Sequence, residues 1–277
     1  SFTVASGSVF CLLGANGAGK TTTIKLFLGF LSPTSGSAEV DGLNPQHDPL
    51  AVRRRLLYIP ETVALYDELT GIENLDYFAR LAGVEDRAPA RLLECLQAAG
   101  LAPDAVGRRV GHYSKGMRQK VGIALALVKE AKALLLDEPT SGLDPLMEAV
   151  FQDCVAELAA QGRTVLLSSH ILDQVERICD RVTIIRCGRT VQSGTLGELR
   201  HLTRTTVSAG TSRPVDGLRD RQGVHDVVVD DGRVTFDVDS DHLDDVMVHL
   251  AAFGITSLTC HPPTLEELFL RHYGDEL

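Results

Sequence analysis

The sequence predicts an α/β protein with a mostly parallel sheet, followed by a small, separate α+β domain. Short apolar runs such as Val9–Leu13, Leu56–Ile59 and Ala133–Leu136 alternate with longer segments of helical apolar spacing. Runs of this kind are typical of parallel strands whose two faces are covered by helices. After about residue 201 the segments become shorter and the pattern changes, which indicates a second domain.

The elements of the first domain follow one another along residues 1–200. Apolar residues recur every three or four positions in the helical segments and run together in the strand segments. Stretches that contain Gly or Pro separate them and indicate turns. In chain order we expect strand Val9–Leu13, helix Lys20–Phe30, a turn at Val40–Gly42, strand Leu56–Ile59, a helical segment Gly71–Gly100, a helix from Ser114 to about Glu130, strand Ala133–Leu136, helix Leu146–Ala160, strand Thr164–Ser168, helix Ile171–Cys179 and strand Arg181–Arg186.

The second domain is assigned to residues 203–277, with the element order βαββαβ. This order is typical of ferredoxin-like α+β domains. A final helix is expected from Thr264, which forms a capping-box pattern with Glu267, to Gly274. The elements expected before it are strand Thr205–Ala209, helix Pro214–Arg221, the hairpin strands Asp226–Val229 and Val234–Val238, helix Asp241–Phe253 and strand Ile255–Thr259.

Composition argues against some classes of protein. The net charge of −10 argues against a nucleic-acid partner, because phosphate backbones attract basic surfaces. No apolar run reaches 18 residues, so we expect no segment that spans a membrane unaided. The 6 cysteines lack metal-binding spacing, which favours buried or incidental thiols in a reducing cytoplasm. The sequence does not begin with methionine, and its first residues belong to an expected strand. Together these observations indicate that N-terminal residues are missing.

The segment Gly14-Ala15-Asn16-Gly17-Ala18-Gly19-Lys20-Thr21 fits the phosphate-loop pattern GxxxxGK[ST], between an expected strand and helix. Glycines let the backbone N–H groups turn toward phosphate oxygens, and the helix N-terminus adds its positive dipole end. Lys20 would reach the β- and γ-phosphates of ATP, and the Thr21 hydroxyl would bind Mg²⁺. The predicted nucleotide-binding residues here are Gly14, Asn16, Gly17, Ala18, Gly19, Lys20, Thr21 and Thr22.

Asp137 and Glu138 end the apolar strand Ala133–Leu136. Strands of a parallel sheet present such residues at the carboxyl edge, where ligands bind. We expect Asp137 to hold Mg²⁺ through water and Glu138 to polarise the attacking water. A solvated strand end would explain the same pair if it stood alone, but the phosphate loop favours the catalytic interpretation.

His170 follows the expected strand Thr164–Ser168. At the end of a core strand it could contact a γ-phosphate and steady the attacking water. A lone histidine is more often an ordinary surface or core residue. The motifs around it therefore decide its interpretation as a catalytic residue.

Residues 1 to 194 resemble the ABC ATPase family. Tyr113-Ser114-Lys115-Gly116-Met117 resembles the family's signature motif, and Ser141-Gly142-Leu143-Asp144 resembles its D-loop. His170 lies in the switch-histidine position, and Pro60-Glu61 lies in the position of the Q-loop. The resemblance implies a P-loop NTPase fold with an ABC-type helical insert at about residues 61–127.

The resemblance implies an ATPase that drives a transporter. Two subunits would form a head-to-tail dimer, with Ser114, Gly116 and Asp144 of one subunit completing the nucleotide site of the other. The family's Q-loop residue would place Glu61 near Mg²⁺. A separate transmembrane permease would carry the substrate, so the chain would be cytoplasmic and peripheral on the inner face of the cell membrane.

The chain departs from the family pattern at two points. Glu61 stands where most members have Gln, and the signature has Tyr113, Lys115 and Met117 in place of Leu, Gly and Gln. Lys115 either touches phosphate or faces solvent, and the sequence leaves both open. The aromatic residue that stacks on adenine in the family would lie upstream of the chain.

Three functions compete. A transporter ATPase, serving export, is favoured because the C-terminal segment Pro262–Phe269 resembles the tail of drug-export ATPases. A soluble ABC ATPase of DNA repair or translation would carry a coiled-coil insertion or a second cassette, and a regulatory cassette without hydrolysis would have lost Glu138 or His170. Leu65, Tyr66 and Leu69 could dock a permease helix or simply pack in the core, and the second domain could stabilise, dimerise or sense a ligand.

Overall fold

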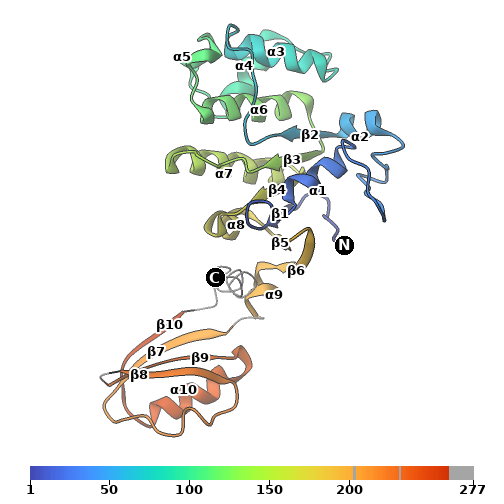
Figure 1. The fold of residues 1–277 in the computed structure, drawn as a ribbon. Helices are drawn as coiled ribbons and strands as arrows, with labels where there is room; N and C mark the ends of the chain where they lie inside the picture. Colours follow the sequence, from blue (N-terminus) through green and yellow to red (C-terminus); the bar gives the residue numbers. More distant parts are fainter. Residues whose placement is uncertain (202–203, 231, 262–277) are drawn as a thin grey trace. The chain divides into compact units, whose positions relative to one another are not determined.

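The computed structural model describes residues 1–201, 204–230 and 232–261. The chain divides into two compact units, Ser1–Ser193 and Gly194–Leu277. Figure 1 labels the elements of both units along the chain. The helix expected between Thr264 and Gly274 lies outside the described residues.

A six-stranded sheet forms the centre of the first unit, with the order β2-β3-β4-β1-β5-β6. Strands β1 to β5 pair in parallel, so the prediction of a mostly parallel sheet is confirmed. β6 was not expected; it follows β5 through the turn Cys187-Gly188, whose residues both have positive φ. The strands are β1 (Val9–Leu13), β2 (Leu56–Ile59), β3 (Ala133–Asp137), β4 (Thr164–Ser169), β5 (Arg181–Arg186) and β6 (Arg189–Thr195).

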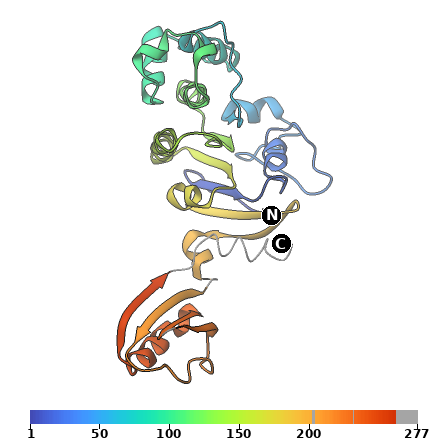
Figure 2. The same ribbon diagram turned by 60° about the vertical axis from the view of Figure 1, so that its left-hand side comes forward.

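Helices cover both faces of this sheet (Figures 1 and 2): α1 and α2 lie on one face, and α7 and α8 on the other. Side chains alternate between faces along each strand, so Phe10 and Leu12 of β1 pack with Ile24 and Leu28 of α1 and with Val52 of α2. These residues form a core between the sheet and the helices α1 and α2. These helices are α1 (Lys20–Phe27), α2 (Pro49–Arg55), α7 (Pro145–Ala160) and α8 (Leu172–Ile178).

A helical insert separates β2 from β3 in the chain. Its first long helix begins at a capping box, in which the Thr70 hydroxyl accepts from the Glu73 amide and the Glu73 carboxylate accepts from the Thr70 amide. The last helix packs against β2 and against two other insert helices. The insert comprises α3 (Gly71–Leu81), α4 (Pro89–Ala98), α5 (Pro103–Val106), a short 3₁₀ turn (Val110–His112) and α6 (Lys115–Lys129).

The second unit contains an antiparallel sheet of order β10-β7-β9-β8, with one helix, α10, packed on its apolar core. All of its strand pairs are antiparallel. The helix predicted at Pro214–Arg221 is wrong, because Gly217 takes a positive φ of 69° and the segment is irregular, although Leu218 still packs in the core. The elements are α9 (Leu196–His201), β7 (Thr205–Thr211), β8 (Val224–Asp230), β9 (Arg233–Val238), a 3₁₀ turn (Ser240–His242), α10 (Leu243–Ala251) and β10 (Ile255–His261).

Across residues 1–201, 204–230 and 232–261, no helix is both long and apolar enough to cross a bilayer.

Candidate nucleotide-binding site

Four strands of the first unit deliver the predicted site segments to one edge of the sheet. The phosphate loop follows β1, Pro60-Glu61 follows β2, Glu138 follows β3 and His170 follows β4. Because these strands are parallel, their carboxyl ends meet at the same edge, which is where α/β sheets bind ligands.

The phosphate loop, Gly14–Thr21, connects β1 to α1. A Cβ atom on Gly14 would lie 2.5 Å from the Ile185 carbonyl oxygen, so no larger residue fits there. Gly17 and Gly19 have φ angles of 81° and 111°, where other residues are strained. No side chain of the described residues caps the N-terminus of α1, so its first amides can donate to an anion.

Lys20 folds back over this loop. Its Nζ donates to the carbonyl oxygens of Gly14, at 2.6 Å, and Ala15, at 3.1 Å. The same Nζ lies 2.9 Å from Glu138 Oε1, and both side chains are largely buried, with exposed fractions of 6% and 13%. This buried ion pair joins the phosphate loop to the end of β3.

Asp137 is the meeting point of three hydroxyl groups. Its Oδ1 accepts from Thr21 Oγ1 at 3.0 Å and from Ser168 Oγ at 2.7 Å. Its Oδ2 accepts from the Tyr58 hydroxyl at 3.4 Å. Burial, together with the nearby Asp137 carboxylate, raises the pKa of Tyr58 to about 12, so the phenol keeps its proton and donates it.

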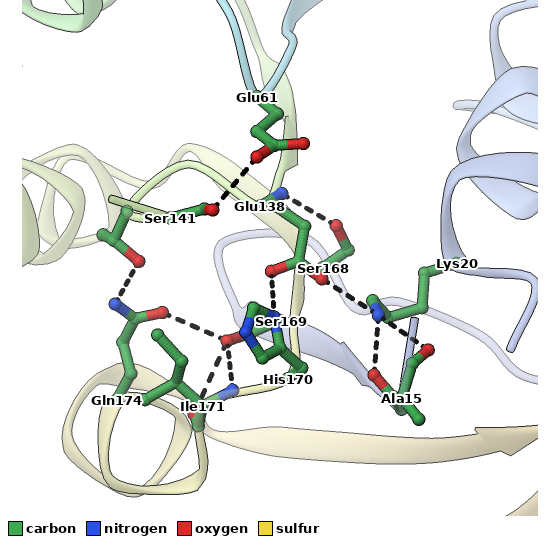
Figure 3. A network of polar contacts seen from close by, with 12 residues as sticks. Ala15, Lys20, Glu61, Glu138, Ser141, Ser168, Ser169, His170, Ile171 and Gln174 are labelled. Atoms are coloured by element: carbon green, nitrogen blue, oxygen red, sulfur yellow. Dashed lines mark hydrogen bonds and ion pairs between the residues drawn. The ribbon is translucent and has the colours of Figure 1, made fainter. Parts of the chain in front are cut away.

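Glu138 lies between Lys20 and His170 (Figure 3). Its Oε2 lies 2.7 Å from His170 Nδ1, opposite the oxygen that meets Lys20. Its φ angle is 46°, a conformation that costs a non-glycine residue about 1–3 kcal/mol and that clusters at functional sites. The Glu138 amide donates to Ser168 Oγ at 2.9 Å, which helps to hold this geometry.

These residues fit a nucleotide with Mg²⁺. The uncapped end of α1, the glycines of the loop and Lys20 supply donors and positive charge for phosphate oxygens. The Thr21 hydroxyl and the Asp137 carboxylate, 3.0 Å apart, are the hard oxygen ligands that Mg²⁺ prefers. Within the described residues no cluster of three His, Cys, Asp or Glu could hold a metal, and Mg²⁺ with a nucleotide needs only one or two protein ligands.

The signature residues lie at the starts of α6 and α7. Ser114 Oγ caps α6 by accepting from the amide three residues on, at 3.3 Å, and Asp144 Oδ1 caps α7 in the same way, at 3.0 Å. Gly116 is buried against the side chains of Leu143 and Met147. Over the described part of the chain, Ser114 and Asp144 are bonded to their own helices and not to the phosphate loop.

Glu61 lies with the signature residues. Its Oε1 accepts from Ser141 Oγ at 3.0 Å and lies 3.7 Å from Lys115 Nζ. Figure 3 shows Glu61 with Ser141, away from Lys20. Lys115 Nζ also donates to the Ser141 carbonyl oxygen. Thr21 and Asp137, by contrast, meet each other directly.

The other predicted nucleotide-binding residues differ in burial. Ala18 is buried, whereas Asn16 and Thr22 are exposed. Ser168 and Tyr58, which contact Asp137, were not singled out from the sequence as site residues. The only signal for Ser168 was its place at the end of the strand before His170; pairing of Asp137 with Ser168 in the sheet is what makes it a site residue.

Comparison with known proteins assigns both units. Residues 1–141 match the family described as ABC transporter, and residues 194–273 match the family described as ATP-binding protein DrrA1-3-like, C-terminal domain. A solved structure described as an ATP binding subunit of an ABC transporter has a TM-score of 0.65 and 39% identity, and covers 73% of this chain and 84% of that chain. The dimeric structure of MJ0796, a bacterial ABC transporter cassette, shares the fold at 24% identity and a TM-score of 0.63, over 70% of this chain and 88% of that one.

Several curated proteins are similar to this chain. The linearmycin resistance ATP-binding protein LnrL of Bacillus subtilis (strain 168) is 32% identical and covers 100% of this chain and 93% of its own length. The daunorubicin resistance ATP-binding protein DrrA3 of Streptomyces coeruleorubidus is 36% identical, over 99% and 89%. The ABC transporter ATP-binding protein NatA of Bacillus subtilis (strain 168) is 40% identical, over 72% and 81%. The chain therefore belongs to the ABC transporter family, as an ATP-binding and ATP-hydrolysing subunit.

Proposed function

We infer that this ATPase powers export of a drug through a separate membrane permease. The observation that supports this most is the similarity to LnrL and DrrA3, which are named for resistance to linearmycin and daunorubicin and which the chain matches across both of its units. None of the relatives reported above is described as a protein of DNA repair or translation, the alternative that the sequence left open.

Lys20 and Glu138 change partners when ATP binds. The Lys20 ammonium leaves Glu138 and meets the β- and γ-phosphates, which carry more charge than one carboxylate. Glu138 keeps its contact with His170 and turns its freed oxygen to a water, which it polarises for attack on the γ-phosphate. In this step Glu138 accepts the proton of the water and His170 holds the carboxylate in place.

Thr21 and Asp137 would hold Mg²⁺, since the hydroxyl of one lies 3.0 Å from the carboxylate of the other. Bound Mg²⁺ would offset the charge that develops on the phosphate oxygens. Ser168 and Tyr58 hold Asp137 in its orientation, since both donate to its carboxylate. The further prediction that Glu61 is a metal ligand requires its carboxylate to leave Ser141.

The catalytic unit is a head-to-tail dimer. Ser114, Gly116 and Asp144 do not contact the phosphate loop of their own chain, over the residues that the structure describes. The N-terminus of the 15-residue helix α6 starts at Ser114 and favours an anion. A second copy, turned head to tail, would place this end on the γ-phosphate bound by the first copy.

A groove on the first unit fits a short apolar helix of the permease. It has a volume of about 210 Å³ and is lined mostly by apolar side chains of β2, the segment after it, α3 and α6, among them Leu65 and Phe78. It begins beside Pro60, so an occupant would press directly on the segment that carries Glu61. The ATPase would therefore work on the inner face of the membrane.

Purification from detergent-solubilised membranes tests this function. The tagged chain should co-purify with an integral membrane protein, and Ala64→Arg, which puts a charge in the groove, should abolish that recovery and leave ATP hydrolysis by the free subunit unchanged. Ala90→Arg, on the exposed surface of α4, is the matched control and should keep the partner. Recovery with ribosomes or DNA instead of a membrane protein would contradict the proposal.

A further inference from the structure

We propose that Lys115 is a positioning residue for hydrolysis: with Glu61 it forms a clasp that holds the loop after β3 in place within a single subunit, and it does not bind phosphate. The clasp is defined as Lys115, Glu61 and Ser141. The proposal rests on the ATP hydrolysis inferred above, and goes beyond it by assigning a role to the two residues that depart from the family pattern.

Three contacts make up the clasp. Lys115 Nζ donates to the Ser141 carbonyl oxygen and lies 3.7 Å from Glu61 Oε1. Ser141 Oγ donates to the same Glu61 oxygen at 3.0 Å. Each residue of the clasp therefore contacts the other two, and the three come from the start of α6, the segment after β2 and the segment after β3.

A surface ion pair alone contributes little, because solvent screens it. The side chains of Lys115 and Glu61 are 31% and 54% exposed, so their charge attraction would be weak without further support. Ser141 supplies that support, since its backbone and its hydroxyl each bond one partner. Removing either charged residue leaves the other with an incomplete set of contacts.

The backbone on both sides of the contact between Lys115 and Ser141 allows the two segments to approach each other closely. Gly142 has a positive φ of 71°, and a Cβ atom placed on it would lie 3.8 Å from Lys115 Nζ. Gly116 lets the side chains of Leu143 and Met147 approach the start of α6, where a Cβ atom would meet Leu143 at 3.3 Å. The start of α6 is thus packed onto the loop as well as bonded to it.

The clasp is connected to the catalytic carboxylate through one turn of backbone. The Ser141 amide donates to the Glu138 carbonyl oxygen at 3.1 Å. Anything that fixes Ser141 therefore limits how far Glu138 can move. Because Glu138 acts on the water and not on nucleotide affinity, losing the clasp should lower kcat and leave the KM for ATP nearly unchanged.

A double-mutant cycle of Lys115→Met and Glu61→Gln tests the clasp. Each single variant should lower kcat about tenfold, and the double variant should be no slower than the slower single, because the two side chains act as one unit. Neither single variant should change the KM for ATP or the Mg²⁺ concentration for half-maximal rate by more than about twofold. Lys120→Met is the matched control on α6: its Nζ donates to the Gly100 carbonyl oxygen, away from the clasp, and kcat should stay unchanged.

Other outcomes would overturn the proposal. Independent effects would multiply to about a hundredfold loss in the double variant. A raised KM for ATP in Lys115→Met would assign Lys115 to phosphate, and a raised Mg²⁺ requirement in Glu61→Gln would assign Glu61 to the metal. Failure of the unmodified chain to hydrolyse ATP would contradict the proposed function instead.

If the unmodified chain does not hydrolyse ATP, hydrogen exchange in the nucleotide-free protein still tests the clasp. Amides of residues 140–144 should exchange faster in each single variant, with no further increase in the double variant. Exchange that stays at the level of the unmodified chain in both single variants would contradict the clasp.

Discussion

Two clusters of side chains at the same sheet edge differ in burial and in how closely their residues contact one another. The phosphate-loop cluster (Gly14–Thr21, Asp137, Glu138 and His170) is joined by short contacts and is largely buried around Lys20 and Asp137. The signature cluster (Ser114–Gly116, Ser141 and Asp144) is more exposed, and its two capping side chains are bonded to their own helices.

The difference shows what each cluster can do with one chain. The phosphate-loop cluster already has donors for phosphate, two oxygen ligands and a carboxylate next to a histidine. The signature cluster has a helix end that favours an anion but, within the described residues, no phosphate grip of its own. In the proposed dimer, the phosphate-loop cluster would bind and hydrolyse the nucleotide, and the signature cluster would complete the site of the second copy.

The largest effect is expected for Glu138→Gln. An amide accepts no proton from the attacking water, so kcat should fall by about a hundredfold or more. ATP affinity should be kept, because Lys20 and the loop amides are intact. Phosphate release and an ATP titration measure the two quantities. An unchanged turnover rate would show that Glu138 is not the base. The phosphate-loop cluster would then no longer differ from the signature cluster by its catalytic carboxylate.

A smaller effect is expected for Ser168→Ala. This variant tests whether hydrogen bonds hold the phosphate-loop cluster together. Ser168 is fully buried, and the substitution leaves Asp137 without one donor and the Glu138 amide without its acceptor. The free energy of unfolding should fall by about 1–3 kcal/mol in denaturant titrations. Ser8→Ala, at an exposed hydroxyl, is the control and should cost about 0.5 kcal/mol or less. Equal stability of the two variants would show that the cluster is not held through Ser168.

The smallest effect concerns Tyr58 and pH. Its pKa is raised in the folded chain from 10 to about 12, so the unfolded chain loses the phenolic proton first. The stabilising contribution of the neutral phenol is therefore complete below pH 10 and is lost as the pH rises toward 12. Tyr58→Phe should make the free energy of unfolding less sensitive to pH between 10 and 12. Identical slopes in the two proteins would mean that burial and the Asp137 carboxylate do not raise the pKa of this group.

The sequence predicted the elements that carry the phosphate-loop cluster well, for a local reason. A phosphate loop is contiguous, and strand ends bring Glu138 and His170 to it without further information. Contacts between distant segments were not predictable. Ser168 depends on the register of β3 and β4, and the meeting of Glu61 with Lys115 depends on how the whole helical insert folds back.

The errors in the fold have physical causes as well. β6 is an edge strand with mostly exposed, polar residues, so it lacks the apolar pattern by which strands are recognised. The segment Pro214–Arg221 has apolar residues at helical spacing, but the positive φ of Gly217 interrupts it. Leu218 packs in the core in spite of this, which is why the pattern suggested a buried helix.

The dimer is tested most directly by the mass of Glu138→Gln with and without MgATP, measured by light scattering during gel filtration. The variant binds ATP without turnover, so its mass should double with MgATP and return to that of one chain without it. Adding Ser114→Arg, which places a bulky side chain at the start of α6, should keep the mass at one chain even with MgATP, whereas adding the exposed control Ser37→Arg should not. A Glu138→Gln chain that stays single at saturating MgATP, or a dimer that tolerates Ser114→Arg, would contradict a site shared between two subunits.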